Sequence, residues 1–181
     1  MSFAKTLLLF CVLSLTACGG GVGDDLFPEG DDRREPVAPG SIGTQVGQQS
    51  PDFTLQDTLA VPHTLTTELA GADAVVLYFT MWCPICDSHT SHIRAVVEPA
   101  FPNVSFFLVD YVSGSISAAR AAQLANGYAS STVLVDVNQA LFNLYNASMG
   151  TTVVIDSSGI VRMNEDYKDG VKLQQILAAL P

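Results

Sequence analysis

The chain has 181 residues, of which 18 are acidic and 8 are basic, so its formal net charge is −10 at pH 7. This length is enough for one domain with a sizeable hydrophobic core. The small number of basic residues argues against a nucleic-acid partner, because such binding depends on Lys and Arg side chains that neutralise several phosphates.

The first segment, MSFAKTLLLFCVLSLTACGGG, has the pattern of an export signal. The basic residue Lys5 precedes an uninterrupted apolar run over residues 7–13, which is too short to span a bilayer and is typical of a signal-peptide core. The tail LTAC resembles a bacterial lipobox, in which the cysteine is lipidated and becomes the first residue of the mature chain. We therefore expect residues 1–17 to be a lipoprotein signal peptide and Cys18 to be the lipidated residue that anchors the protein in the bilayer. The alternative is an ordinary cleaved signal with a chance cysteine.

Removal of the signal and lipidation of Cys18 leave two free thiols, Cys83 and Cys86. The expected location is the bacterial cell envelope, with the domain facing the periplasm, where disulfides persist. Under the sorting rule of enteric bacteria, Gly19 favours the outer membrane over the inner one. A single cysteine pair in such a compartment indicates a redox couple rather than a zinc site.

Residues 18–50 are predicted to form a flexible tether, because they are rich in Gly, Pro and charged residues and lack apolar periodicity. From Pro51 the composition changes, and residues 51–181 are predicted to form the folded domain. The first stretch of this domain, PDFTLQDTLAVPHTL, predicts a short strand pair around a Pro-containing turn.

Residues 72–80, ADAVVLYFT, are continuous, β-branched and aromatic, which predicts a buried strand. This strand runs directly into Trp82-Cys83-Pro84, where the proline fits the first turn of a helix. We expect that helix over residues 85–97, ending near Pro99. A second buried strand is predicted over VSFFLVDY, residues 104–111.

The rest of the chain continues the alternation of helices and strands. ISAARAAQLANGY predicts a helix that ends at Asn126-Gly127, and TVLVD predicts a third strand whose Asp136 can cap a helix around residues 140–145. TTVVIDSSGIVRM predicts a hairpin, and residues 170–180 predict an amphipathic helix. This order indicates an α/β sandwich with a central mixed sheet flanked by helices and an N-terminal β-hairpin extension.

Four potential metal ligands stand three residues apart, namely Cys83, Cys86, His89 and His92. On one helix each three-residue step rotates a side chain by about 300°, so His92 faces away from Cys83 and lies roughly 13.5 Å further along the axis. Zinc bonds are only about 2.0–2.3 Å long, so one straight helix cannot close all four ligands around one ion. We therefore predict no metal site and no cofactor.

The redox interpretation uses the same two cysteines. Cys83 at the start of a helix meets unpaired N–H groups and the positive end of the helix dipole, which favour a nucleophilic thiolate. Cys86, one turn along, can attack the mixed disulfide that Cys83 forms. Trp82 is expected to lie beside the pair as an apolar platform.

A buried strand that ends in WCPIC and is followed by a helix resembles the thioredoxin superfamily, over most of residues 51–181. SPDFTLQD, VVLYFTMWCPIC and TTVVIDSSGIV resemble the membrane-tethered TlpA/ResA/CcmG group and the related redoxin (AhpC/TSA-like) domains. The resemblance implies thiol–disulfide exchange with extracytoplasmic protein thiols or disulfides, and a membrane redox partner. The docking surface that it implies consists of Trp82, Pro84, Met149, Gly150 and Thr151.

The chain departs from the family pattern at three positions. Gly150 stands where the family has a cis-proline facing the cysteines, and Leu77 stands where thioredoxins bury an acidic residue. Ile85 replaces the histidine that precedes the second cysteine in DsbA-like motifs, so we expect a less oxidising couple than in those proteins.

Two other functions and one structural role remain as alternatives. Thr80-Met81-Trp82-Cys83-Pro84 resembles the TxxCP motif of peroxiredoxins, with Cys83 as the peroxidatic residue and Arg120 or Arg162 as the cationic group, although Val76 stands where that family has a proline. A copper-binding assembly factor resembling Sco proteins would use CxxxC, which is not the spacing here. A purely structural disulfide across one helical turn would close a very small loop and stabilise little.

Overall fold

The structure is a computed structural model, and it describes residues 37–180. The predicted signal peptide (residues 1–17) and the predicted lipidation site Cys18 lie outside the described residues. Among residues 37–180, no helix combines the length and the apolar content needed to cross a membrane.

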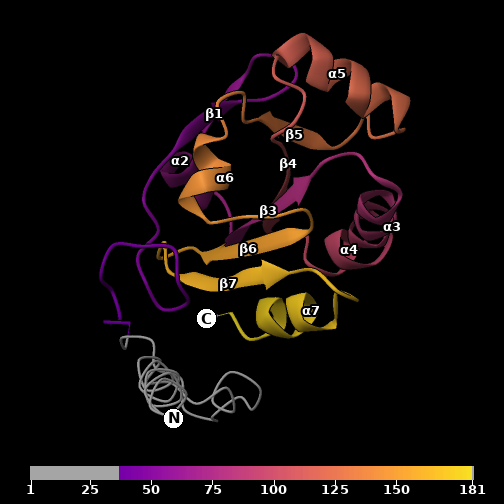
Figure 1. Ribbon diagram of the computed structural model, residues 1–181. Coiled ribbons are helices and arrows are strands. Elements are labelled where there is room, and N and C mark those ends of the chain that lie inside the picture. Colours follow the sequence, from indigo (N-terminus) through magenta and orange to yellow (C-terminus); the bar gives the residue numbers. More distant parts are fainter. Residues whose placement is uncertain (1–36, 181) are drawn as a thin grey trace, which may run out of the picture. The chain divides into compact units, whose positions relative to one another are not determined.

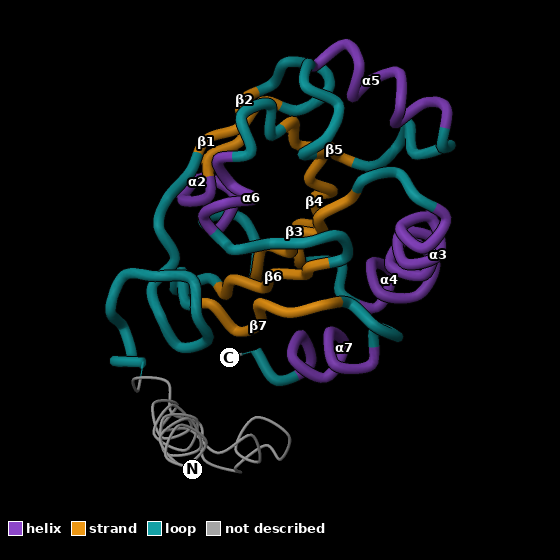
Figure 2. The backbone as a smooth tube through the Cα atoms, viewed as in Figure 1, coloured by secondary structure: helices purple, strands orange, loops and turns teal. Residues whose placement is uncertain are grey.

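A five-stranded mixed sheet forms the centre of the domain, with the strand order β5-β4-β3-β6-β7 (Figures 1 and 2). β3, β4 and β5 are parallel, and β6 and β7 are antiparallel to their neighbours. The predicted mixed sheet and the predicted hairpin of β6 and β7 are therefore confirmed. The strands are β3 Ala74–Thr80, β4 Val104–Asp110, β5 Thr132–Val135, β6 Thr151–Asp156 and β7 Val161–Asp166.

Helices cover both faces of this sheet (Figure 1). One face carries α3 Pro84–His92, the π-helical turn η1 Ile93–Val97, α4 Glu98–Ala100 and α7 Val171–Ala178. The other face carries α2 Leu65–Leu69 and α6 Ala140–Leu144, and α5 Ile116–Ala125 lies beside β5. This arrangement confirms the predicted thioredoxin-like α/β sandwich.

The two faces of β3 belong to different hydrophobic clusters, because successive side chains of a strand point to opposite faces. Val76 and Tyr78 pack with Cys86 and with residues of α7 in the cluster that we call the α3-side cluster. Leu77 and Phe79 pack with residues of α2 and α6 on the opposite side. Every residue of β3 is buried, which explains why the strand is continuously apolar in the sequence.

The helix that follows the cysteines ends near Pro99, as predicted, and the proline lies within its last turn. The helical turns continue to Ala100, and the turn before the proline widens, so that the Glu98 N–H donates to the carbonyl of Ile93, five residues back. A proline ring normally clashes with the carbonyl four residues earlier and lacks an N–H. The π turn changes this hydrogen-bonding register and accommodates Pro99.

The prediction of a flexible tether is wrong for its last part. Gly47 N–H donates to the carbonyl of Val161, and Val161 N–H donates to the carbonyl of Gln48, so this segment adds to the edge strand β7. The hydroxyls of Ser50 and Tyr145 lie 2.6 Å apart in a buried contact. A polar, Gly-containing segment can thus be ordered by the unpaired backbone groups of an edge strand, which composition does not reveal.

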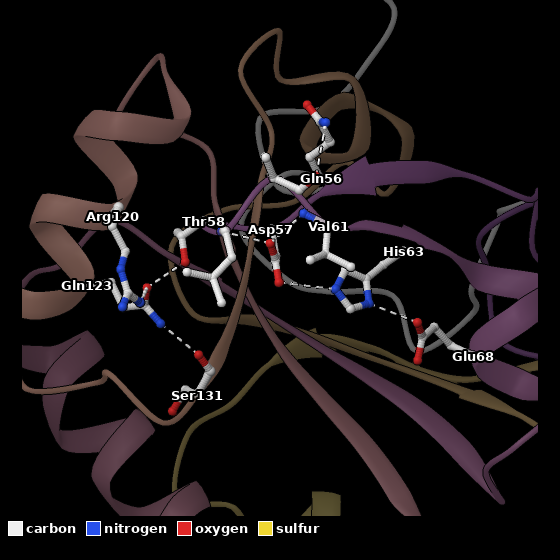
Figure 3. Close-up of polar contacts among 11 residues, drawn as sticks. Gln56, Asp57, Thr58, Val61, His63, Glu68, Arg120, Gln123 and Ser131 are labelled. Carbon is white, nitrogen blue, oxygen red and sulfur yellow. Dashed lines mark hydrogen bonds and ion pairs between the residues drawn. The ribbon is translucent and has the colours of Figure 1, made fainter.

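The N-terminal hairpin extension is present as β1 Thr54–Gln56 and β2 Pro62–Thr64, paired antiparallel. Figure 3 shows how its turn is held. Asp57 Oδ1 accepts the N–H groups of Leu59 and Val61, and Asp57 Oδ2 lies 3.3 Å from Nε2 of His63. The other ring nitrogen of His63, Nδ1, lies 2.8 Å from the Glu68 carboxylate in α2.

We expect Asp57→Ala to lower the free energy of unfolding at pH 7 by about 1 kcal/mol, because the N–H groups of Leu59 and Val61 in the turn lose their acceptor. Burial raises the pKa of Asp57, but the N–H groups of Val61 and Leu59 and the neighbouring His63 lower it, and the net pKa lies below its ordinary value. Stability from this carboxylate is therefore present above the unfolded-state pKa, about 4, and is lost as the pH falls through the folded-state pKa.

Urea unfolding followed by circular dichroism at several pH values measures this effect. Asp73→Ala, at an exposed acid, is the control and should change stability by less than about 0.5 kcal/mol. Equal losses in the two variants, or a deficit in Asp57→Ala that persists unchanged to pH 3, would contradict the prediction.

Candidate active site

Cys83 lies between the end of β3 and the start of α3, at the N-cap position of the helix. Its Sγ accepts the backbone N–H of Cys86 at 3.3 Å, and Pro84 occupies the first turn, where a missing N–H has no cost. The side chain is half-buried, so the sulfur remains accessible. A sulfur at this position receives the N–H groups and dipole that stabilise an anion.

Cys86 lies one turn further along α3 and is buried, with 1% of its surface exposed. Its Sγ is 2.9 Å from Sγ of Cys83, and both thiols are free. Burial raises the pKa of the Cys86 thiol, but hydrogen bonds with Cys83, with the backbone at Met81 and Cys83, and with the Thr80 hydroxyl lower it below its ordinary value. The two sulfurs are thus positioned to form and open a disulfide with little movement.

Trp82 is fixed in an unusual backbone conformation beside Cys83. Its φ angle is 60°, which is rare for a bulky residue, and its N–H donates to Oγ1 of Thr80 at 3.1 Å. The indole Nε1–H donates to Oδ2 of Asp110 at 2.7 Å. The ring also lies 6.3 Å from the ring of Tyr128, so the expected platform is anchored on both sides.

Sequence reasoning missed Asp110, which is 1% exposed and also accepts the N–H groups of Val112 and Ser113. Asp110 is the last residue of β4 and pairs in register with Thr80, the last residue of β3. The carboxyl ends of adjacent parallel strands meet at one edge of a sheet, and this rule could have identified the residue.

Asp110→Asn is expected to slow disulfide exchange roughly fivefold, the equivalent of about 1 kcal/mol. The amide can still accept the loop N–H groups, but its NH₂ group would face the Trp82 N–H and cannot accept it. Trp82 is the single tryptophan of the chain, so its fluorescence should also change.

The control for that prediction is a double-mutant cycle. If Asp110 acts through Trp82, adding Asp110→Asn to Trp82→Phe should slow exchange no further than Trp82→Phe alone. Additive effects of the two substitutions would contradict this role for Asp110.

The predicted docking segment lies in the loop before β6, and it contains Gly150 with a φ angle of 86°. No cis peptide bond occurs among residues 37–180. The Gly150 N–H donates to the carbonyl of Phe79, its carbonyl accepts the N–H of Tyr167, and the Thr151 N–H donates to the carbonyl of Ser148. The backbone of Gly150 and the N–H of Thr151 are therefore already paired within the domain.

Met149 differs from its two neighbours in the docking segment. Its side chain is half-buried and packs against the α3-side cluster, as do Trp82 and Cys83. In the described part of the chain, no hydrogen bond joins the backbone of Met149 to another residue. Of the three predicted docking residues in this loop, Met149 has both free backbone groups and an accessible side chain.

The residues of the alternative functions are not brought together at Cys83. Arg120 donates to Gln123 in α5 (Figure 3), and Arg162 pairs with Asp156 at the end of β6 remote from the cysteines. Both guanidinium groups are thus engaged with other side chains, and no hydrogen bond of residues 37–180 joins either of them to Cys83. His89 Nδ1 lies 3.0 Å from the Tyr78 hydroxyl, and His92 Nδ1 lies 2.6 Å from the Tyr167 hydroxyl. The Nδ1 atom of each histidine therefore contacts a tyrosine and not Cys83.

A mixed sheet with a dithiol at the junction of a central parallel strand and a helix defines a thioredoxin-like redox protein. The AhpC/TSA family model matches residues 46–164, and the chain belongs to that family.

Similar proteins agree with this assignment. A thioredoxin-like protein of Bacillus subtilis, YneN, is 22% identical over 122 residues, which cover 67% of this chain and 71% of YneN. A candidate protein disulfide isomerase from Bacteroides thetaiotaomicron superposes with a TM-score of 0.65 at 21% identity, covering 76% of this chain and 90% of that one. The exposed lipoprotein thioredoxin Etrx1 of Streptococcus pneumoniae gives a TM-score of 0.56 at 23% identity, covering 70% of this chain and 98% of the other.

Proposed function

We propose that this protein is a lipid-anchored, extracytoplasmic thiol–disulfide oxidoreductase that exchanges disulfides with protein substrates through its CPIC motif. The observation that carries the proposal is the sulfur pair: an accessible Sγ of Cys83 at a helix N-terminus, 2.9 Å from the buried Sγ of Cys86. This arrangement separates an attacking sulfur from a protected resolving sulfur.

In the reducing direction the Cys83 thiolate attacks one sulfur of a substrate disulfide. A bond forms between Cys83 and that sulfur, and the other substrate sulfur leaves with the electron pair and takes up a proton. Cys86 then loses its proton and attacks Sγ of Cys83, which releases the second substrate thiol. The cysteine pair is oxidised by two electrons, the substrate disulfide is reduced, and a membrane redox partner restores the dithiol.

Exposed apolar side chains around Cys83 fit a polypeptide substrate. Met81, Ile85 and Val112 are 45%, 55% and 45% exposed, although they are large apolar residues. Met81 and Ile85 flank the reactive cysteine in sequence, and Val112 follows the Asp110 anchor of Trp82. With Trp82, Pro84 and Met149 they provide an apolar border on which an extended chain can dock while its backbone meets that of Met149.

Anchoring is proposed from the lipobox-like LTAC and from the likeness to an exposed lipoprotein thioredoxin. Cys18 would hold the domain at the bacterial envelope, with the outer membrane favoured by Gly19. Growth with a radiolabelled fatty acid tests this directly. The wild-type chain should carry label and pellet with membranes, whereas Cys18→Ser should carry none; equal labelling of the two would refute lipidation at Cys18.

Two parallel assays test the activity, namely reduction of insulin disulfides and consumption of hydrogen peroxide. We expect insulin reduction that needs both Cys83 and Cys86, with little peroxide turnover. Rapid peroxide turnover that needs Cys83 alone would instead support the peroxiredoxin-like alternative of this family. Stoichiometric copper that is lost when either cysteine is replaced would support the Sco-like alternative.

A further inference from the structure

The buried thiol of Cys86 must lose its proton before it can attack, and the acidic residue of thioredoxins is missing here. Leu77, at that position, is fully buried on the α6 side of the sheet, opposite to the cysteines. Among the hydrogen bonds of residues 37–180, none joins an Asp or Glu side chain to either cysteine. Another group has to receive the proton.

The next residue of β3, Tyr78, lies on the side of the cysteines. Its side chain is 1% exposed and belongs to the α3-side cluster together with Cys86. Its hydroxyl lies 3.0 Å from Nδ1 of His89. Burial and, after it, the neighbouring Cys86 thiol raise the pKa of this hydroxyl. His89 is one turn beyond Cys86 on α3 and is half-buried, so its ring joins the buried hydroxyl to the surface.

Gly150 brings the docking loop directly over this pair. A Cβ atom at Gly150 would lie 3.7 Å from Nδ1 of His89 and 4.0 Å from the Tyr78 hydroxyl. The tyrosine and histidine therefore lie beneath the loop that the family places opposite the two cysteines. Tyr78 also packs in the α3-side cluster with Cys86, and Cys83 packs against that cluster.

We infer that Tyr78 and His89 form a proton relay that deprotonates Cys86 in the resolving step. The Cys86 S–H bond breaks as its proton passes to the Tyr78 oxygen, while the Tyr78 proton passes to Nδ1 of His89. The resulting Cys86 thiolate attacks Sγ of Cys83, and the electron pair of the mixed disulfide leaves with the substrate sulfur. The His89 imidazolium then returns a proton to solvent. This inference rests on the proposed function.

The relay is needed most in the mixed disulfide. In the dithiol form, a hydrogen bond with Cys83 helps to lower the pKa of Cys86. Once Cys83 is bonded to the substrate, its sulfur no longer shares a proton with Cys86, and this contribution disappears. The Tyr78–His89 pair does not depend on the state of Cys83, so it remains available when Cys86 has to react.

The surrounding groups keep the relay in the right protonation state. Burial and then the charge of His92 lower the pKa of His89, so its ring is a neutral acceptor at pH 7. Burial and then Cys86 raise the pKa of Tyr78, so its hydroxyl passes a proton without ionising by itself. Cys83 and Tyr167 are further titratable neighbours of this pair. The Tyr167 ring, which precedes α7, lies 4.8 Å from the His89 ring, and burial and Asp169 raise the pKa of Tyr167 to about 12.

The test is a single-turnover reaction of the reduced protein with a dye-labelled peptide disulfide. Attack by Cys83 releases the first thiol, and resolution by Cys86 releases the second. In wild type the second release should rise with pH through an inflection that belongs to His89. Tyr78→Phe and His89→Gln should remove that inflection and slow the second release roughly a hundredfold at pH 7, with convergence toward wild type at high pH.

His89→Gln separates a relay from a structural role, because the amide oxygen can still accept the Tyr78 hydrogen bond but cannot take up a proton. His92→Gln should keep the relay and move the inflection to higher pH, because a neighbouring positive charge is removed. The double variant Tyr78→Phe/His89→Gln should be no slower than either single variant, because both break the same path.

Release of the first thiol is the internal control and should stay within about threefold of wild type in every variant, because Cys83 does not use the relay. An unchanged pH profile in His89→Gln, a uniform slowing at all pH values, or an inflection unmoved by His92→Gln would overturn the relay while leaving the proposed function intact. Failure of the wild-type protein to release even the first thiol would instead refute the proposed function.

Discussion

Replacing Cys86 with serine is expected to trap the protein in a covalent complex with its substrates, whereas replacing Cys83 with serine should abolish exchange. Cys83→Ser should lower the rate by at least roughly a thousandfold, equivalent to about 4 kcal/mol of barrier, because a hydroxyl at the helix N-cap does not ionise near neutral pH. Cys86→Ser leaves the attack by Cys83 possible but removes the sulfur that resolves the mixed disulfide.

Non-reducing electrophoresis of envelope proteins after acid quenching measures the trapped complexes, and insulin reduction measures turnover. Cys86→Ser should show adducts that dithiothreitol removes, and the double variant Cys83→Ser/Cys86→Ser should show none. Adducts in Cys83→Ser but not in Cys86→Ser would reverse the two roles. Their different exposure makes that outcome inconsistent with the structure, since Cys86 is 1% exposed.

Introducing the proline of the family at position 150 is expected to damage this protein rather than improve it. Gly150 has a φ angle of 86°, whereas proline requires about −65°. Its N–H also donates to the carbonyl of Phe79, and proline has no N–H. Gly150→Pro should therefore lower the free energy of unfolding by about 3 kcal/mol or more and should displace the loop that covers Tyr78 and His89.

Gly150→Ala measures the free-energy cost of the left-handed backbone conformation separately from the cost of a steric clash. The nearest side-chain atom to an added Cβ would be 3.7 Å away, an ordinary contact, so the expected loss is the left-handed backbone cost of about 1–2 kcal/mol. Urea unfolding gives both losses, and the exchange rate is measured where each variant is still folded.

A matched control lies at the end of α5. Gly127 also has a positive φ, 78°, it donates its N–H to Leu124, and an added Cβ would meet no atom within 4 Å. Gly127→Pro should lose similar stability without slowing exchange in the folded state. Equal kinetic effects at the two glycines, or a Gly150→Pro variant as stable as wild type, would contradict this account of the docking loop.

Much of the fold could be predicted because its signals are local. β3 is continuously apolar, Pro84 marks a helix start, and Asn126-Gly127 marks a helix end where Gly127 adopts a positive φ. The order of these elements was enough to indicate an α/β sandwich with a mixed sheet, and the resemblance carried by WCPIC indicated the thioredoxin-like form. The error occurred where a local signal is overridden: residues 40–50, predicted as part of a flexible tether, are ordered by the edge of β7.

The candidate site divides in the same way. The spacing of Cys83 and Cys86 is a property of one helix turn, so the sequence by itself determined the dithiol and its position after a buried strand. Asp110, which accepts the Trp82 indole N–H, lies on β4, and Tyr78, which contacts His89, lies on β3. Only the packing of these strands against α3 brings the two residues close to the cysteines. Asp110 is 28 residues from Trp82, so no periodic pattern in the sequence connects the two. Sheet register, and not distance along the chain, brings this carboxylate to the indole.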